Sequence, residues 1–155
     1  MDQAKATPHD ENSELYQAGM AEIRKQLGPM ADDYIRSIKA LSPEFAWVNV
    51  TFPFAELYTR DVVDLKTREL CTVAALTVQG FSLPELRLHI GAALRCGATR
   101  GEVAEIITQM IAYCGFPAAT NALMTMKQVF EAIDAKPQSE EGSSAAAGSP
   151  QGPTA

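Results

Sequence analysis

Residues 65–93 contain the side chains whose types and spacing could do chemistry. They include His89, the only histidine outside the N-terminal tail, together with Arg68, Glu69 and Glu85. A carboxylate beside an imidazole can pair with its protonated form and orient the ring for general acid/base catalysis. The pattern therefore predicts proton-transfer chemistry around His89.

Each of these residues also has an ordinary structural explanation. His89 lies beside the apolar stripe of its expected helix, where one hydrogen bond would satisfy it. Glu85 precedes His89 by one helical turn, but in Ser-Leu-Pro-Glu it is also the N3 residue of a capping box. Glu69 has mostly apolar helical neighbours, so its charge is costly unless it is paired. A solvated glutamate at a helix start is the simpler alternative, and both explanations stay open here.

Two arginines near this stretch could bind an anionic ligand. Arg60 follows an aromatic segment that contains Glu56 and Tyr58, and Arg68 precedes Glu69. Guanidinium groups bind carboxylates through paired hydrogen bonds, so the two arginines together could hold a substrate carboxylate. A lone arginine more commonly extends its charged end into solvent.

Composition restricts the function classes. The chain has 155 residues, which favours one domain, and a net charge of −6 without a Lys/Arg cluster, which argues against nucleic-acid binding. No apolar run approaches the roughly 18 residues that a membrane span needs. The N-terminal residues lack the basic start and apolar block of a signal peptide, so we expect a cytoplasmic protein.

The cysteines and histidines do not form a recognisable metal or redox motif. Cys71, Cys96 and Cys114 are widely spaced and form no Cys-x-x-Cys pair, so we expect reduced, mostly buried thiols. With two histidines, one of them in a tail, no zinc site built by the protein is expected.

Apolar periodicity and helix-breaking residues predict an all-α domain of about six helices. Asp64 and Thr99 are expected helix N-caps, Gly80 a helix end, and Ser82 the start of the capping box that contains Glu85. We expect a flexible tail at 1–12, the helical domain at 13–135 and a disordered Ser/Gly/Ala/Pro-rich tail at 136–155. The expected helices span 14–27, 31–41, 65–79, 83–96, 100–114 and 118–135, with a short helix at 43–50 and a helical turn that opens at Pro53.

Several segments, taken together, resemble the carboxymuconolactone decarboxylase family over roughly residues 66–130. They are KTREL, LRLHIGAALRCG, ATRGEVAE and YCGFPA. The resemblance implies an alkylhydroperoxidase D-like helical fold. Members with peroxidase activity carry Cys-x-x-Cys-x-x-x-His, and counting back from His89 places Ser82 and Glu85 at the cysteine positions. Neither residue forms a thiolate, which excludes dithiol peroxide reduction.

The resemblance implies decarboxylation of a carboxylated unsaturated lactone, without a cofactor, in aromatic catabolism. Loss of carbon dioxide leaves a dienolate whose electrons move into the lactone carbonyl. The protein must therefore bind the carboxylate, exclude water, stabilise an oxyanion and deliver a proton. The implied site residues are the catalytic His89, Glu69 and Glu56 and the substrate-binding Arg60, Arg68 and Glu85.

The resemblance further implies a homo-oligomer, a trimer or hexamer, that acts on a small carboxylic acid or lactone. Two other functions remain open. One is a lactone hydrolase, isomerase or proton-transfer enzyme on the same site, because a fold does not determine a reaction. The other is a non-catalytic oligomeric binding protein, in which a backbone carbonyl would satisfy a buried His89 and no pocket would lie beside it.

Overall fold

The computed structural model describes residues 9–135, and this part of the chain is helical without a β-strand. The expected all-α class is confirmed, and the arrangement is consistent with the alkylhydroperoxidase D-like fold. The predicted tail at 136–155 lies outside the described residues, as do residues 1–8. The longer helices are α1 (Glu14–Leu27), α2 (Ala31–Leu41), α4 (Leu65–Gln79), α5 (Leu83–Arg95), α6 (Arg100–Gln109) and α7 (Ile111–Asp134), and the shorter elements are η1 (Gly28–Met30), α3 (Pro43–Asn49) and η2 (Val50–Leu57).

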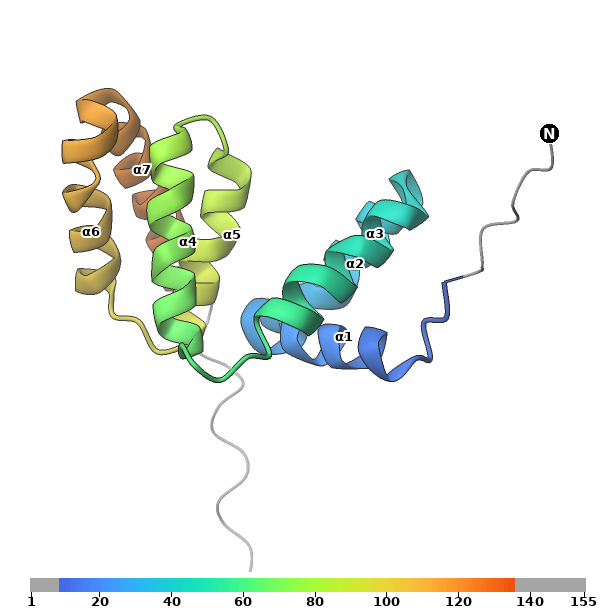
Figure 1. Cartoon of the computed structure of the whole chain (residues 1–155). Helices are drawn as coiled ribbons and strands as arrows, with labels where there is room; N and C mark the ends of the chain where they lie inside the picture. Colours follow the sequence, from blue (N-terminus) through green and yellow to red (C-terminus); the bar gives the residue numbers. More distant parts are fainter. Residues whose placement is uncertain (1–8, 136–155) are drawn as a thin grey trace, which may run out of the picture.

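The helices form two groups, α1 to α3 on one side and α4 to α7 on the other (Figure 1). Each group has its own apolar cluster, and α5 contributes to both: Ala92 packs with the first and Ile90 with the second. The first cluster contains Tyr16, Met20, Ile23, Leu27, Ala31, Ile35, Val50 and Phe54. The second contains Val73, Leu86, Ala93, Ala98, Val103, Ile107, Ala122 and Val129.

A close backbone approach joins α1 to η2. A Cβ atom added at Gly19 would lie 2.3 Å from the Val50 carbonyl oxygen, which no side chain tolerates. Glycine at this position therefore allows η2 to pack directly on α1. This packing positions the end of η2, from which the loop to α4 begins.

The segment η2 is a π-helix that contains Pro53, and it corrects the prediction of a helical turn opening at that proline. The backbone N–H of Tyr58 donates to the Pro53 carbonyl at 2.9 Å, five residues back. Proline has no N–H and collides with the preceding turn of an ordinary α-helix. A wider π-turn accommodates it within the helix instead of at its start.

Two of the three predicted N-caps are present. The Asp64 side chain accepts from the backbone N–H of Thr67, and Thr99 forms the predicted capping box with Glu102. The prediction for Ser82 is wrong: its side chain makes no cap bond and donates to the Gln79 side chain instead. The Ser82 backbone has φ −84° and ψ 51°, which is not the extended conformation that directs an N-cap side chain at the first turn of its helix.

The boundary between the last two helices lies earlier in the chain than the predicted helices at 100–114 and 118–135 place it. Helix α6 ends at Gln109, and α7 already begins at Ile111. The expected break at Gly115 is a kink inside α7, with φ 74° and ψ 172°. No described helix combines the length and apolarity that a membrane crossing requires.

The expectation of mostly buried thiols is wrong for Cys71, which is exposed, while Cys96 and Cys114 are partly buried. Cys71 lies on α4 two residues after the buried Glu69, so it falls on a different side of the helix.

Candidate active site

Glu69 and His89 meet between α4 and α5. The His89 Nδ1 atom lies 2.7 Å from Glu69 Oε2, across 20 residues of sequence. The Glu69 side chain is completely buried, whereas that of His89 remains 22% exposed. Asp64 begins α4 and Gly80 ends it in the left-handed conformation, so the turn returns the chain antiparallel and brings the two side chains together.

The pair has one fixed nitrogen and one available nitrogen. A buried carboxylate accepts from Nδ1–H, which leaves His89 Nε2 to act on a ligand. In the neutral ring, Nε2 is a base. In the protonated ring it is an acid, and Glu69 balances its charge. The geometry therefore fits proton transfer in either direction at a single nitrogen atom.

The second oxygen of Glu69 has no partner among the described residues. Glu69 Oε1 is buried and accepts no hydrogen bond, although its companion Oε2 is paired. A buried carboxylate oxygen without a donor is costly, and such atoms concentrate at functional sites. This oxygen is available to a donor that enters the site.

Tyr58 is a site residue that the sequence analysis did not select. Its hydroxyl lies 3.0 Å from Thr72 Oγ1, and Thr72 donates to the Arg68 carbonyl at 3.0 Å, so Tyr58 is the donor to Thr72. Burial, followed by the negative charge of Glu69, raises the pKa of the Tyr58 phenol to about 12. Tyr58 therefore stays neutral at ordinary pH and places a hydroxyl close to Glu69. Its position directly after the proline-containing segment was the available sequence signal.

The structure gives Arg68 a local role. Its Nε donates to the Val63 carbonyl at 2.9 Å and its Nη2 to the Arg60 carbonyl at 3.0 Å, which secures the loop between η2 and α4. The Arg60 side chain is exposed and has no hydrogen bond to a described residue. Their predicted joint grip on a carboxylate is thus not preformed: Arg68 is largely occupied, and Arg60 is available.

The carboxylates of Glu56 and Glu85 are exposed and form no hydrogen bond or ion pair within residues 9–135. Glu85 does not cap α5, so the expected competition between capping and pairing with His89 does not arise. Its charge instead acts on Tyr34 of α2, whose pKa is raised mainly by burial and further by Glu85. Glu69, not Glu85, is the partner of His89.

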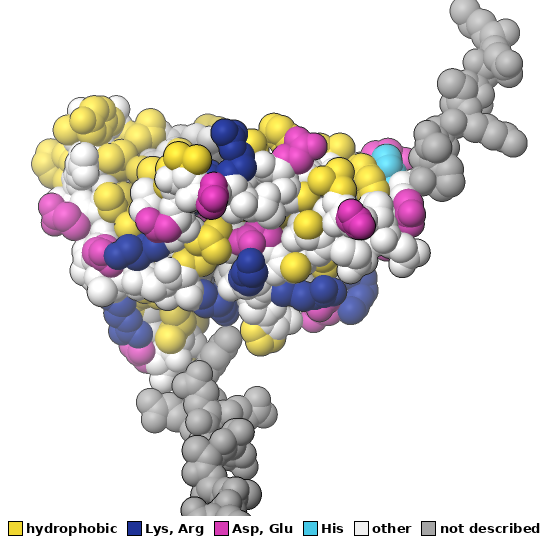
Figure 2. Space-filling model, turned by 60° about the horizontal axis from the view of Figure 1, so that its bottom comes forward, with side chains coloured by type: hydrophobic (Ala, Val, Ile, Leu, Met, Phe, Trp, Pro, Cys, Tyr) yellow, Lys and Arg dark blue, Asp and Glu magenta, His cyan; other side chains and the backbone are white. Residues whose placement is uncertain are grey.

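The charged surface is mixed. On the face drawn in Figure 2, Lys and Arg side chains are interspersed with Asp and Glu and with apolar patches. In the described part of the chain, no three His, Cys, Asp or Glu side chains gather in a way that could hold a metal ion. The exclusion of nucleic acid as a partner remains a prediction.

Comparisons with known proteins identify related sequences. A sequence model of the carboxymuconolactone decarboxylase family matches residues 43–128, a range that includes both Glu69 and His89. The chain is 33% identical over 123 residues to an uncharacterized 15.0 kDa protein from the nqo9-nqo10 intergenic region of Paracoccus denitrificans, covering 78% of this chain and 91% of the relative. It is 29% identical over 107 residues to a 4-carboxymuconolactone decarboxylase of Acinetobacter baylyi, covering 69% and 74%. The chain therefore belongs to the carboxymuconolactone decarboxylase family.

Proposed function

We propose that the protein decarboxylates a carboxylated unsaturated lactone similar to 4-carboxymuconolactone, with His89 as the general acid/base. Family membership and the Acinetobacter relative support the reaction class. The observation that carries the proposal is the 2.7 Å contact between His89 Nδ1 and the buried Glu69 carboxylate, since it leaves Nε2 for the substrate. A role in cytoplasmic aromatic catabolism belongs to the same proposal.

The proposed step breaks the bond between the ring carbon and the substrate carboxylate. The electron pair of that bond moves through the ring double bond into the lactone carbonyl, giving a dienolate and carbon dioxide. Protonated His89 then donates from Nε2 to carbon and yields the enol-lactone, and solvent returns the proton. Glu69 keeps the ring oriented and balances its positive charge before the donation.

The decisive experiment follows carbon dioxide release and enol-lactone formation from 4-carboxymuconolactone. His89→Gln should lower kcat/KM by about 10²–10⁴-fold, the usual contribution of a positioned acid or base. His9→Gln is the matched control, because His9 stacks on Trp47 at 4.6 Å in the N-terminal group. Unimpaired turnover by His89→Gln would overturn the proposal.

The same assay separates the alternatives. Loss of substrate without carbon dioxide indicates the related lactone hydrolase or isomerase, and saturable binding without any turnover indicates a binding protein. The binding-only function predicted a His89 satisfied by a backbone carbonyl, whereas Nδ1 here meets a carboxylate. That contact favours an enzyme.

Arg60 is the proposed anchor for the substrate carboxylate, because Arg68 already binds two backbone carbonyls. Arg60→Gln should raise KM with a smaller change in kcat, as expected when uniform binding is lost. The exposed Arg36, which pairs with Asp33 on α2, provides the control substitution Arg36→Gln. An unchanged KM in Arg60→Gln would remove Arg60 from the site.

The protein is further proposed to assemble as a trimer or hexamer. Phe81, in the turn between α4 and α5, and Tyr113 and Phe116, on either side of the kink near the start of α7, are 71–80% exposed. The turn and this part of α7 are adjacent, since a Cβ atom at Gly80 would lie 3.4 Å from the Ala118 Cβ. Exposed aromatic side chains gathered in this way are typical of interfaces. Light scattering across a concentration series tests the assembly, and a monomer throughout would contradict it.

A further inference from the structure

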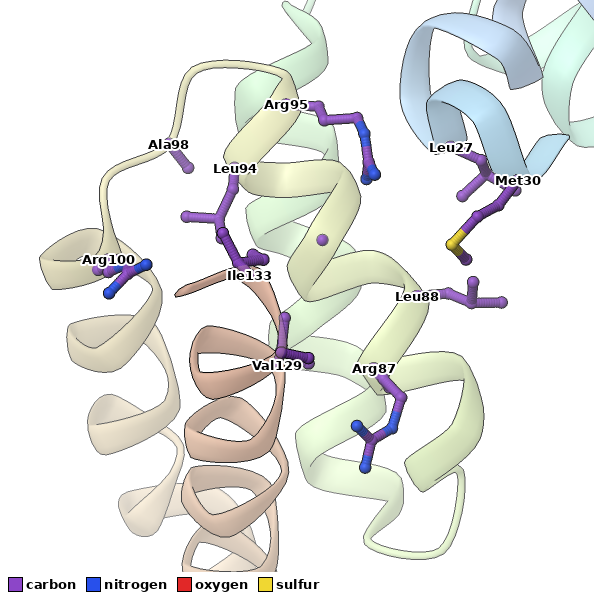
Figure 3. Close-up of a pocket in the computed structure, with 12 residues that line it drawn as sticks. Leu27, Met30, Arg87, Leu88, Leu94, Arg95, Ala98, Arg100, Val129 and Ile133 are labelled. Atoms are coloured by element: carbon purple, nitrogen blue, oxygen red, sulfur yellow. The ribbon is translucent and has the colours of Figure 1, made fainter. Parts of the chain in front are cut away.

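A large open cavity lies on the side of α5 opposite the Glu69–His89 pair. Its volume is about 660 Å³, which lies within the range of small-molecule binding pockets. Figure 3 shows residues of the α1–η1 end, α5 and α7 around it. We call it the arginine groove, since its lining includes Arg87, Arg95 and Arg100.

The arginine groove and the catalytic pair use different faces of one helix. Arg87, Gly91 and Arg95 follow one another at four-residue intervals and line the groove. His89 comes two residues after Arg87, which on a helix is about 200° of rotation. A molecule in the groove therefore would not touch His89, and binding there is separable from catalysis.

The body of the groove is apolar. Leu94 of α5 faces Val129 and Ile133 of α7, whereas Leu88 lies on the other side of the groove with Met30 of η1, nearest the N-terminal group (Figure 3). Met30 and Ile133 are 46% and 41% exposed in the unoccupied groove. A ligand with an apolar body would bury these side chains and gain their hydrophobic free energy.

The charges of the groove have one sign. Its lining contains three arginines and no carboxylate. Asp134 neutralises Arg100 through two hydrogen bonds, and Arg87 donates to the uncharged Gln128. Arg95 has no hydrogen-bond partner among the described residues and crosses towards η1, where a Cβ atom on Gly28 would lie 2.9 Å from its Nε. Arg95 and Arg87 thus supply uncompensated positive charge beside an apolar surface.

We propose that the arginine groove is a second binding site, for an organic monocarboxylate with an apolar body. Arg95 binds the carboxylate, and Leu88, Leu94 and Val129 contact the apolar part. Arg87 lies eight residues from Arg95, about 12 Å along α5, and adds positive charge at the other end of the groove (Figure 3). An uncharged apolar molecule would leave the arginines without a partner, and a small inorganic anion would leave the apolar surface exposed. Only a ligand with both features complements the whole lining.

The test measures binding of octanoate to the full chain by calorimetry, with octan-1-ol as the uncharged analogue. Octanoate should bind saturably. The wild type should bind octan-1-ol at least about ten-fold more weakly than octanoate. Arg95→Gln should bind octanoate more weakly than the wild type by the same factor, which is the usual effect of losing a charge-assisted hydrogen bond. Arg36→Gln should leave binding unchanged. Equal affinity for octanoate and octan-1-ol would overturn the charge-based part of the proposal, and with it the proposed ligand class.

Gly91 allows the groove to be filled directly. A Cβ atom added there meets only Arg95 Nη1, at an ordinary 3.5 Å, so Gly91→Leu can extend into the groove without a backbone clash. This variant should abolish octanoate binding. Gly101→Leu is the matched control, because Gly101 is an exposed helical glycine whose added Cβ would come no closer than 3.8 Å to Thr99. Normal octanoate binding by Gly91→Leu would refute the location.

Two further outcomes complete the test. His89→Gln should bind octanoate normally, and loss of binding in that variant would place octanoate at the catalytic pair instead. Absence of saturable binding at millimolar octanoate, combined with a changed oligomer mass in Gly91→Leu, would show that a second copy of the chain covers the groove. Either result would overturn the proposal.

Discussion

Two buried glutamates, Glu22 on α1 and Glu69 on α4, illustrate how similar burial can serve different ends. Their exposed fractions are 3% and 0%. Glu22 is bound within its own helix, by Lys25 Nζ at 3.0 Å and Gln26 Nε2 at 3.1 Å. Within residues 9–135, Glu69 has one partner, on another helix, and one oxygen without any.

The difference separates a structural acid from a candidate catalytic one. Partners three and four residues away form with the helix itself, so Glu22 stabilises local structure. The partner of Glu69 is 20 residues away, so this contact exists only when α4 and α5 are packed. Burial alone does not identify a site, whereas a distant partner combined with an unpaired oxygen does.

The largest expected effect is on turnover. Glu69→Gln removes the charge that balances protonated His89, and kcat/KM should fall about 100-fold or more. Glu22→Gln keeps a similar shape on α1 and should leave turnover nearly unchanged. Carbon dioxide release from 4-carboxymuconolactone measures both. Equal losses in the two variants would end the distinction between the two glutamates.

For the free energy of unfolding, we expect a larger loss from substitution of Glu22 than from substitution of Glu69. Glu22→Ala leaves the buried Gln26 amide without its acceptor, and the free energy of unfolding should fall by about 1–3 kcal/mol. Glu69→Gln keeps an acceptor for His89 and removes a buried charge, so its change should stay within about 1 kcal/mol. Urea unfolding at neutral pH gives both values. A larger loss in Glu69→Gln would assign Glu69 a mainly structural role.

Tyr58→Phe tests the hydroxyl beside Glu69. Loss of one hydrogen bond should lower kcat/KM about three- to ten-fold. The pKa of Tyr58 is raised from 10.0 to about 12, so the folded state favours the neutral phenol. This contribution to stability is full below pH 10 and is lost as the pH rises towards 12, because the unfolded chain ionises first. Allowing for solvent screening, it amounts to about 1 kcal/mol.

The measurement for Tyr58 is urea unfolding from pH 9 to 11.5. The wild-type stability should decline more steeply than that of Tyr58→Phe. Tyr113→Phe, at a side chain that is 71% exposed, is the matched control and should follow the wild type. Identical slopes in all three proteins would show that folding does not raise the pKa of Tyr58.

The smallest effect concerns Cys96. Burial, then the charge of Glu69 and then that of Glu22, raise the pKa of its thiol to about 11. Iodoacetamide at pH 8 should therefore label the exposed Cys71 well before Cys96, because the thiolate is the reactive form. Glu69→Gln should accelerate Cys96 labelling less than ten-fold, and more than Glu22→Gln does. Mass spectrometry follows both sites. A larger acceleration in Glu22→Gln than in Glu69→Gln would contradict the assignment of Glu69 as the stronger of the two charges on Cys96.

The apolar periodicity of the sequence was sufficient to predict the helices whose ends are marked by particular residues. Helices α1, α2 and α4 have the predicted bounds, since glycine, proline and N-cap residues mark them locally. Pro53 misled the prediction because a π-turn can hold a proline that an α-helix rejects. At Ser82 the capping pattern was present, but the backbone of Ser82 lies at φ −84° and ψ 51°, outside the extended conformation of an N-cap, and its hydroxyl donates to Gln79 instead.

The site was predictable from the sequence where burying a charged side chain would be energetically unfavourable without a partner. A glutamate among apolar neighbours needs a partner, and this argument pointed to Glu69 and His89. Glu22 escaped notice because its partners are local and its burial depends on how α1 packs. Tyr58 and the arginine groove depend on contacts between distant segments, which no local pattern reveals. The catalytic roles of His89, Glu69 and Glu56 and the substrate-binding roles of the other three residues remain predictions.

The π-helix η2 also makes the site sensitive to chain length. A π-turn is an α-turn with one residue added, so deleting Pro53, the residue that an ordinary α-helix rejects, would restore ordinary helical winding. Every later side chain on that helix would then rotate by about 100° and shift by about 1.5 Å. Tyr58 would leave Thr72 although its amino-acid type had not changed. In this segment, insertions and deletions would therefore alter the site more than many substitutions.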